Sequence, residues 1–186
     1  MALLGCNMTL TDMQPLMPIL KKNIKRNISK LDSKSKSLGD SAAGSNKART
    51  LRPPKGSKAG NEVSGSERTL GKIKAAQLVW GNRKQMDDLK PPFDFIIAAD
   101  VVYLEEIVDP LIETMRDLSA YDTIIVLGYK LRQEEAHELF WEALPKVFDV
   151  EKVAREDLDA AYAFAGVDLF ILRLKRDHVG GVSQRD

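Results

Sequence analysis

The sequence predicts an α/β protein with a mainly parallel sheet. Two short apolar runs, Phe93–Ala99 and Thr123–Leu127, are typical of strands buried on both faces. Apolar residues recur at helical spacing over 104–118 and 136–147, so an amphipathic helix is expected after each of these strands. Alternation of buried strands with such helices places the strands side by side in a sheet that helices cover.

The remaining elements complete this pattern. A short strand is expected at Cys6–Asp12 and is followed by a helical apolar stripe over 13–24. A further strand is expected at Ala75–Trp80. The last two strands, Phe148–Val153 and Leu169–Leu174, have no helix between them, so they are expected to form an antiparallel pair at one edge of the sheet.

Composition divides the chain into four segments. Residues 1–28 and 70–176 carry the elements of the folded domain. Residues 29–69 are rich in Ser, Lys and Gly and contain no aromatic residue, so we expect a disordered basic insertion. Residues 177–186 are expected to form a flexible tail.

The scarcity of cysteine and histidine excludes several classes of site. Cys6 is the only cysteine, which rules out a disulfide or a thiolate zinc cluster within the chain. His137 and His178 are the only histidines, and we expect both at the surface rather than in a metal site or a catalytic triad. No apolar run has the length of a membrane span. A reducing compartment is expected, the cytoplasm first and the nucleus second.

Charge is unevenly distributed along the chain. Residues 21–75 contain 15 Lys/Arg and 4 Asp/Glu, a net charge of +11, while the rest of the chain carries −10. A basic segment can bind nucleic acid or an acidic protein. A solvated loop is the simpler interpretation, so nucleic acid is disfavoured as a partner.

Polar and aromatic residues follow several predicted strands, where α/β sheets bind their ligands. Asp12 can accept hydrogen bonds from a ribose diol, although aspartate is also an ordinary helix cap. The Trp80 ring can pack on an adenine or simply cover the core. Asp100, with Tyr103 close by, can hold an amine or a cofactor group, or can cap a helix. The same rule selects Gly128–Lys130.

Taken in order, these segments resemble a known family. The quoted pieces are Thr-Leu-Thr-Asp, Leu-Val-Trp-Gly, Pro-Phe-Asp-Phe-Ile-Ile-Ala-Ala-Asp-Val-Val-Tyr, Ile-Ile-Val-Leu-Gly-Tyr-Lys-Leu-Arg and Glu-Leu-Phe-Trp-Glu-Ala-Leu. They look like the seven-β-strand protein-lysine methyltransferases with an Asp-x-x-Tyr motif, the methyltransferase-like 21 group. The Asp-Val-Val-Tyr segment is the most specific part of the resemblance, which covers the chain apart from 29–69 and the tail.

The resemblance implies a Rossmann-like class I methyltransferase sheet and a role for each matching residue. Asp12 would bind the ribose hydroxyls of S-adenosylmethionine, Trp80 would lie beside the adenine, and Ala99 would line the cofactor pocket. Asp100 and Tyr103 would be the catalytic residues that shape the channel where a lysine amine meets the sulfonium methyl group.

The implied activity is S-adenosylmethionine-dependent methylation of lysine on a protein, with chaperones and translation factors as typical substrates and without a metal. Tyr129 would line the substrate side. A catalytically inactive fragment or pseudoenzyme that acts as a protein-binding module is the alternative. A nucleic-acid methyltransferase is disfavoured because Asp100–Tyr103 replaces an Asn-Pro-Pro-Tyr motif. A nicotinamide-dependent dehydrogenase is disfavoured because Gly-x-Gly-x-x-Gly is absent.

The chain departs from the family pattern at its beginning. The family has a first strand and a Glu-x-Gly-x-Gly loop ahead of the position that matches Met1, and no Gly-x-Gly occurs within these 186 residues. We therefore expect an N-terminally truncated sheet in which the central first strand is missing and two strand edges are unpaired. Because glycines let the backbone approach the cofactor, we also expect weak or no cofactor binding.

Overall fold

The computed structural model describes residues 1–40, 71–161, 164 and 166–176. The chain divides into two compact units, Met1–Gln77 and Leu78–Asp186, and each is described by itself. The boundary between them falls within the segment 70–176 that the sequence groups as one piece, because the strand at 73–77 pairs with the N-terminal strand. Residues 41–69 of the insertion expected at 29–69, and the expected tail at 177–186, lie outside the described residues.

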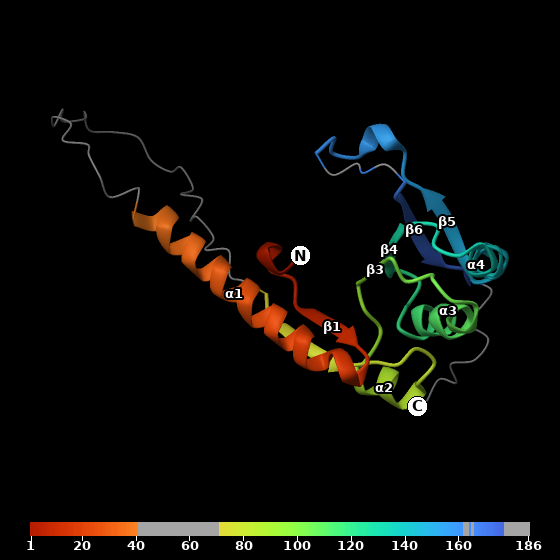
Figure 1. Ribbon diagram of the computed structural model, residues 1–186, viewed down its shortest axis with the longest axis horizontal. Coiled ribbons are helices and arrows are strands. Elements are labelled where there is room, and N and C mark those ends of the chain that lie inside the picture. The colour runs from red at the N-terminus through yellow and green to blue at the C-terminus, as the bar shows by residue number, and fades with distance from the viewer. Residues whose placement is uncertain (41–70, 162–163, 165, 177–186) are drawn as a thin grey trace, which may run out of the picture. The chain divides into compact units, whose positions relative to one another are not determined.

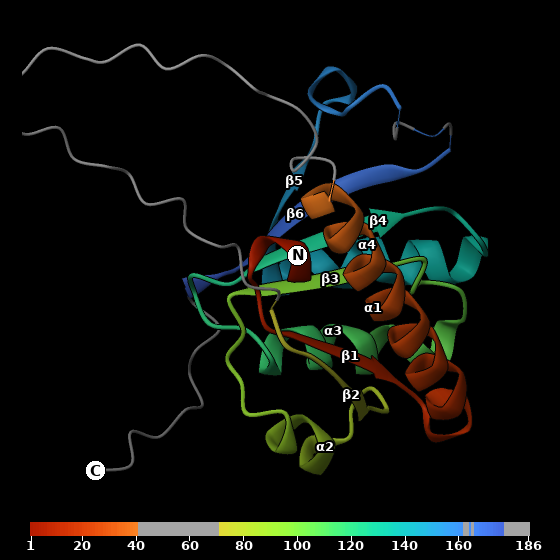
Figure 2. The same cartoon turned by 90° about the vertical axis from the view of Figure 1, so that its left-hand side faces the viewer.

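The first unit is a parallel strand pair joined by a helix. Its elements are η1 (Ala2–Leu4), β1 (Met8–Asp12), η2 (Gln14–Leu16), α1 (Met17–Asp40) and β2 (Ile73–Gln77). In the register of the pair, Met8 lies opposite Ile73 and Asp12 lies opposite Gln77. The helix α1 runs alongside both strands (Figure 1, Figure 2), and Ile24 and Ile28 of α1 border Ala75 of β2.

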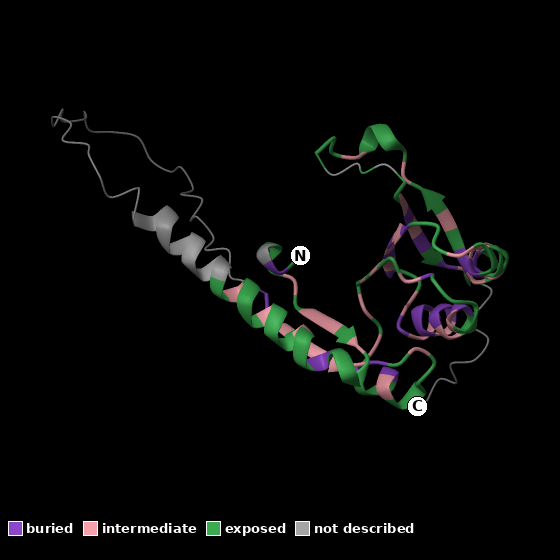
Figure 3. Cartoon of the chain, viewed as in Figure 1, coloured by how far each residue is buried: buried purple, intermediate pink, exposed green. Residues whose placement is uncertain are grey.

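Helix α1 is longer than the sequence pattern indicates. It begins with Met17-Pro18 and continues to Asp40, so its last turns occupy part of the range expected to be disordered. Proline suits the first turn of a helix, and no further proline or glycine occurs before Gly39. The described part of α1 is mostly exposed (Figure 3), with Met17 buried.

A glycine allows the N-terminal segment to approach the strand pair closely. The Gly71 N–H donates to the Ala2 carbonyl at 2.9 Å, and the Met8 N–H donates to the Lys72 carbonyl at 2.7 Å. A Cβ atom on Gly71 would stand 1.9 Å from the Cys6 carbonyl oxygen, so only glycine can occupy this position without a backbone shift.

The second unit contains a four-stranded mixed sheet. Its helices and strands are α2 (Arg83–Asp88), β3 (Phe95–Ala99), η3 (Glu105–Ile107), α3 (Val108–Asp117), β4 (Ile124–Tyr129), α4 (Glu134–Val147), β5 (Phe148–Lys152), η4 (Arg155–Asp157) and β6 (Asp168–Leu174). The strand order is β3-β4-β6-β5. The pair β3–β4 is parallel, whereas β6 is antiparallel to both β4 and β5. The expected α/β class and the antiparallel pairing of the last two strands are confirmed.

The strand expected at Ala75–Trp80, and the segment that follows it, differ from the prediction. Strand β2 ends at Gln77, so Trp80 lies in a turn and not at the end of the strand. Gly81 follows with φ 78°, a left-handed conformation that favours glycine. The unpredicted helix α2 begins directly afterwards, because the Asn82 side chain caps it by accepting from the Gln85 N–H at 3.1 Å.

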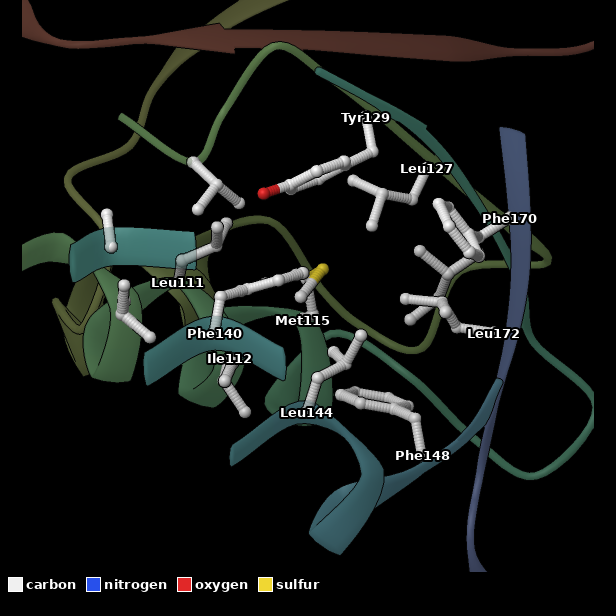
Figure 4. Close-up of a cluster of buried hydrophobic side chains, with 14 of the residues drawn as sticks. Leu111, Ile112, Met115, Leu127, Tyr129, Phe140, Leu144, Phe148, Phe170 and Leu172 are labelled. Carbon is white, nitrogen blue, oxygen red and sulfur yellow. The ribbon is translucent and has the colours of Figure 1, made fainter. Parts of the chain in front are cut away.

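Helices α3 and α4 cover one face of the four-stranded sheet. Leu111, Ile112 and Met115 of α3 and Phe140 and Leu144 of α4 pack against inward-pointing residues of the strands (Figure 4). The strand residues in this core include Ile125, Leu127, Phe148, Phe170 and Leu172. Most of the fully buried side chains of the described residues belong to this cluster, so the second unit has a core of its own.

Strand β3 is not buried on both faces, and that prediction is wrong. Ile96 and Ala98 pack against the core, but Phe95 and Ile97 are 48% and 56% exposed. The reason is that α3 and α4 lie on the other face of the sheet and that β3 pairs only with β4 among the described residues. Likewise, β1 pairs only with β2, so each sheet ends on an unpaired edge.

Candidate active site

Asp12 is the last residue of β1 in the first unit. One carboxylate oxygen, Oδ1, accepts a hydrogen bond from the Met13 N–H at 2.8 Å. This contact is to the next residue along the chain, and it is not the helix cap that the sequence allows, because Met13 and not Asp12 takes the N-cap position of η2. It engages one of the two oxygens, and a carboxylate has further acceptor sites for hydroxyl groups.

The Trp80–Gly81 turn of the second unit is attached to helix α3. The Gly81 N–H donates to the Thr114 hydroxyl at 2.8 Å, and that hydroxyl donates to the Pro110 carbonyl at 2.7 Å. Thr114 is buried, at 4% exposure. The Trp80 side chain is half-buried and packs against the core cluster. The ring therefore has a fixed base and a solvent-accessible part, as a stacking surface requires.

Ala99 and Asp100 stand at the carboxyl end of β3. Ala99 is exposed and lies opposite Gly128 of β4, so two small residues lie side by side on the neighbouring strands. The Asp100 N–H donates to the Gly128 carbonyl at 3.0 Å. Asp100 has φ 57°, in the left-handed region that aspartate tolerates better than most residues, and there the chain leaves the strand.

The Asp100 carboxylate forms a bidentate ion pair with Arg132. Arg132 Nε donates to Oδ1 at 2.6 Å and Nη2 donates to Oδ2 at 2.5 Å. The hydrogen bond from Arg132, together with the charges of Arg132 and Lys130, lowers the pKa of Asp100 below its usual value. The hydrogen bond to Asp100 and the charge of its carboxylate raise the pKa of Arg132. Asp100 is therefore a carboxylate, and not a carboxylic acid, at neutral pH.

Tyr103 lies three residues after Asp100, in the connection that precedes η3. Its side chain is 41% exposed. Its hydroxyl has no hydrogen-bond partner among the residues that the structure describes, so it is available to a ligand. Asp100 and Tyr103 are thus both accessible at the carboxyl end of β3.

Tyr129 and His137 differ from what the sequence indicates. Tyr129 ends β4 but is only 7% exposed, stacks on Phe140, and shares a hydrogen bond of 2.6 Å between its hydroxyl and Nδ1 of His137. Burial raises the pKa of Tyr129. His137 is half-buried and is not a surface residue. Figure 4 shows the Tyr129 ring within the core, which makes it a packing residue in this structure.

Sequence reasoning missed two residues of the site, Arg132 and Thr114. Arg132 lies beyond the Gly128–Lys130 segment that the strand-end rule selects, in the connection between β4 and α4. The sequence pattern that could have pointed to it is an arginine after one strand, β4, when an aspartate follows the neighbouring strand, β3. Thr114 lies within a helix, where a threonine gives no sign that its hydroxyl binds a distant turn.

Two features are absent from residues 1–40, 71–161, 164 and 166–176. No helix in these ranges is long and apolar enough to cross a membrane. The same ranges contain no group of three or more His, Cys, Asp or Glu side chains that could hold a metal ion.

The second unit has the features of one class of protein. A mixed sheet with an antiparallel pair of final strands, and an Asp-x-x-Tyr segment at the carboxyl end of a parallel strand, are consistent with a class I methyltransferase domain.

Comparison with known proteins agrees with this class. Residues 60–146 match the lysine methyltransferase family. The protein N-lysine methyltransferase METTL21A of Danio rerio is 30% identical over 154 residues, which are 82% of this chain and 52% of the relative. The EEF1A lysine methyltransferase 3 of Xenopus tropicalis is 29% identical over 157 residues, 83% of this chain and 51% of the relative. The chain is similar to the lysine methyltransferase family over these residues, and it spans about half the length of the curated relatives it matches.

Proposed function

We propose that this chain carries the site that binds the substrate lysine in an S-adenosylmethionine-dependent protein-lysine methyltransferase with a Rossmann-like class I sheet. The observation that carries the proposal is the accessible Asp100 carboxylate, held at the carboxyl end of β3 with Tyr103 three residues away. Similarity to the lysine methyltransferase family suggests the reaction type, and the relatives named above are protein lysine methyltransferases.

Particular residues are suited to the adenosine part of the cofactor. In the first unit, Asp12 has one carboxylate oxygen engaged by the backbone and further acceptor capacity for ribose hydroxyls. In the second unit, Trp80 offers a supported aromatic ring for the adenine, and Ala99 leaves room for the cofactor beside β3. For the methionine part, no Gly-x-Gly segment occurs within these 186 residues.

The chemistry needs positioning and charge balance more than it needs proton transfer. S-adenosylmethionine supplies an electrophilic methyl group that a neutral amine attacks in line. In this proposal, Asp100 accepts a hydrogen bond from the lysine amine and stabilises the positive charge that develops on its nitrogen. Tyr103 accepts or donates a further hydrogen bond to the bound lysine in this proposal.

The substrate is proposed to be a lysine of a folded protein. One relative is named an EEF1A lysine methyltransferase, so EEF1A is the first substrate to try.

The test is transfer of a radiolabelled methyl group to purified EEF1A at several millimolar S-adenosylmethionine, a concentration that occupies even a weak site. Asp100→Asn is expected to reduce the transfer rate by about 10²-fold, because it removes the charge that stabilises the developing cation. Asp94→Asn makes the same chemical change just ahead of the opposite end of β3, and it should leave the rate unchanged. Equal rates for wild type and Asp100→Asn would contradict the role of Asp100.

A catalytically inactive protein-binding module is the second candidate, favoured by the absence of Gly-x-Gly from the chain. The same assay separates the two. A folded chain that transfers no methyl group at millimolar cofactor, yet forms a stoichiometric complex with EEF1A in sedimentation, would support the binding module against the enzyme.

A further inference from the structure

The contact between Asp100 and Arg132 joins two strand ends of the second unit. Asp100 follows β3, and Arg132 lies in the connection from β4 to α4. The two guanidinium nitrogens Nε and Nη2 reach one carboxylate oxygen each, at 2.6 and 2.5 Å, so both oxygens are engaged. Bidentate pairs of this kind fix orientation as well as charge.

The pair also constrains the backbone at Asp100. A φ of 57° is an unfavourable conformation for most L-residues and less so for aspartate. Two fixed contacts hold it there: the Asp100 N–H bonded to the Gly128 carbonyl, and the side chain bonded to Arg132.

The electrostatic surroundings of the carboxylate are positive. Arg132 from the β4–α4 connection and Lys130, which directly follows β4, are the cations that act on it. The nearest anion along that connection is Glu134 at the start of α4, whose charge acts on Tyr129. The Asp100 carboxylate is therefore charge-balanced before any substrate arrives, although it remains about half exposed.

Charge balance matters for an amine that must be neutral to react. A lone carboxylate next to a lysine favours the ammonium form, since opposite charges stabilise each other, and an ammonium has no lone pair with which to attack. A carboxylate already paired with a guanidinium keeps its hydrogen-bonding lone pairs but favours the ammonium much less.

We propose that Arg132 is a positioning residue that holds Asp100 in its left-handed conformation and balances its charge, so that the substrate amine is bound in its neutral, reactive form. This inference rests on the proposed function and adds to it the way in which the Asp100 carboxylate is oriented and charge-balanced before the substrate binds.

The test is the pH dependence of kcat for methyl transfer to EEF1A at millimolar S-adenosylmethionine. Since kcat reports groups in the substrate complex, its acidic limb follows the bound amine. Arg132→Gln is expected to move the midpoint of this limb upward by about half to one pH unit, a shift reduced from that of a buried pair because both groups are half exposed. Arg132→Lys should lie between wild type and Arg132→Gln.

Arg173→Gln, which changes an exposed arginine of β6, serves as the matched control and should leave the midpoint unchanged. A variant that merely damages the fold would lower the rate at every pH without moving the limb, and that result for Arg132→Gln would overturn the proposal.

Carboxyl ¹³C NMR of the full chain provides a readout that does not depend on turnover. Asp100, assigned through Asp100→Asn, is expected to titrate below the ordinary aspartate pKa of about 3.9 in the wild type and closer to that value in Arg132→Gln. Identical titration in both proteins would overturn the proposal even if wild type is active. If wild type itself transfers no methyl group, the proposed function fails and this inference fails with it. If wild type is active and either result above overturns the role of Arg132, only this inference fails.

Discussion

Replacing Thr114 by valine should loosen the Trp80–Gly81 turn. The Thr114 hydroxyl accepts from the Gly81 N–H at 2.8 Å and is itself buried, so valine would leave that N–H facing a methyl group. An unsatisfied donor costs about 1–3 kcal/mol. Because Gly81 is exposed as a residue and water can reach part of the turn, we expect the lower part of that range, about 1–1.5 kcal/mol.

Hydrogen exchange of the Gly81 amide measures this loss directly. A reduction of about 1.4 kcal/mol in the free energy of opening corresponds to about tenfold faster exchange. Thr114→Ser keeps the hydroxyl and should keep the protection of this amide. Unchanged Gly81 exchange in Thr114→Val would refute the reasoning, and so would equally fast exchange in Thr114→Ser, since the effect would then come from lost packing.

Three further outcomes are expected. Ile125→Ala, in the core of β4, should lower the free energy of unfolding in urea by about 2–5 kcal/mol, whereas Ile97→Ala on the exposed face of β3 should cost less than about 1 kcal/mol; equal losses would contradict the one-sided burial of the sheet. Gly71→Ala should disrupt the β1–β2 pairing, because its Cβ would overlap the carbonyl oxygen of Cys6; unchanged hydrogen exchange across β1 would contradict this. Calorimetry of a polypeptide of just these 186 residues should find S-adenosylhomocysteine bound more weakly than micromolar, since it contains no Gly-x-Gly; micromolar affinity would show that other residues replace the glycines.

Sequence periodicity predicted the helices and strands of the second unit well because its core is made of regular apolar patterns. Helix α4 and strands β4 to β6 are found within one or two residues of their expected limits. The prediction that β3 is buried on both faces was wrong, because an apolar run in the sequence does not show which elements pack against each face of the strand. The Ile97 side chain is as apolar as that of Ile125, yet it is 56% exposed.

The sequence predicted residues of the candidate site only where an acidic or aromatic residue follows the end of a strand. Asp100 and Tyr103 are found in an accessible position, as their place after β3 predicted. Tyr129 follows the same rule but turns into the core, because strand residues alternate between faces and its neighbour Gly128 takes the other one. Arg132 could not be foreseen, since an ion pair between two loops depends on tertiary structure.

The most direct test of the central claim is mass spectrometry of EEF1A after incubation with this chain and isotopically labelled S-adenosylmethionine. We predict labelled methyl groups on the Nε atom of lysine, abolished by Asp100→Asn and retained in Asp94→Asn. Label on another residue type, or label that survives Asp100→Asn undiminished, would contradict the assignment of Asp100 to a lysine-methylating site.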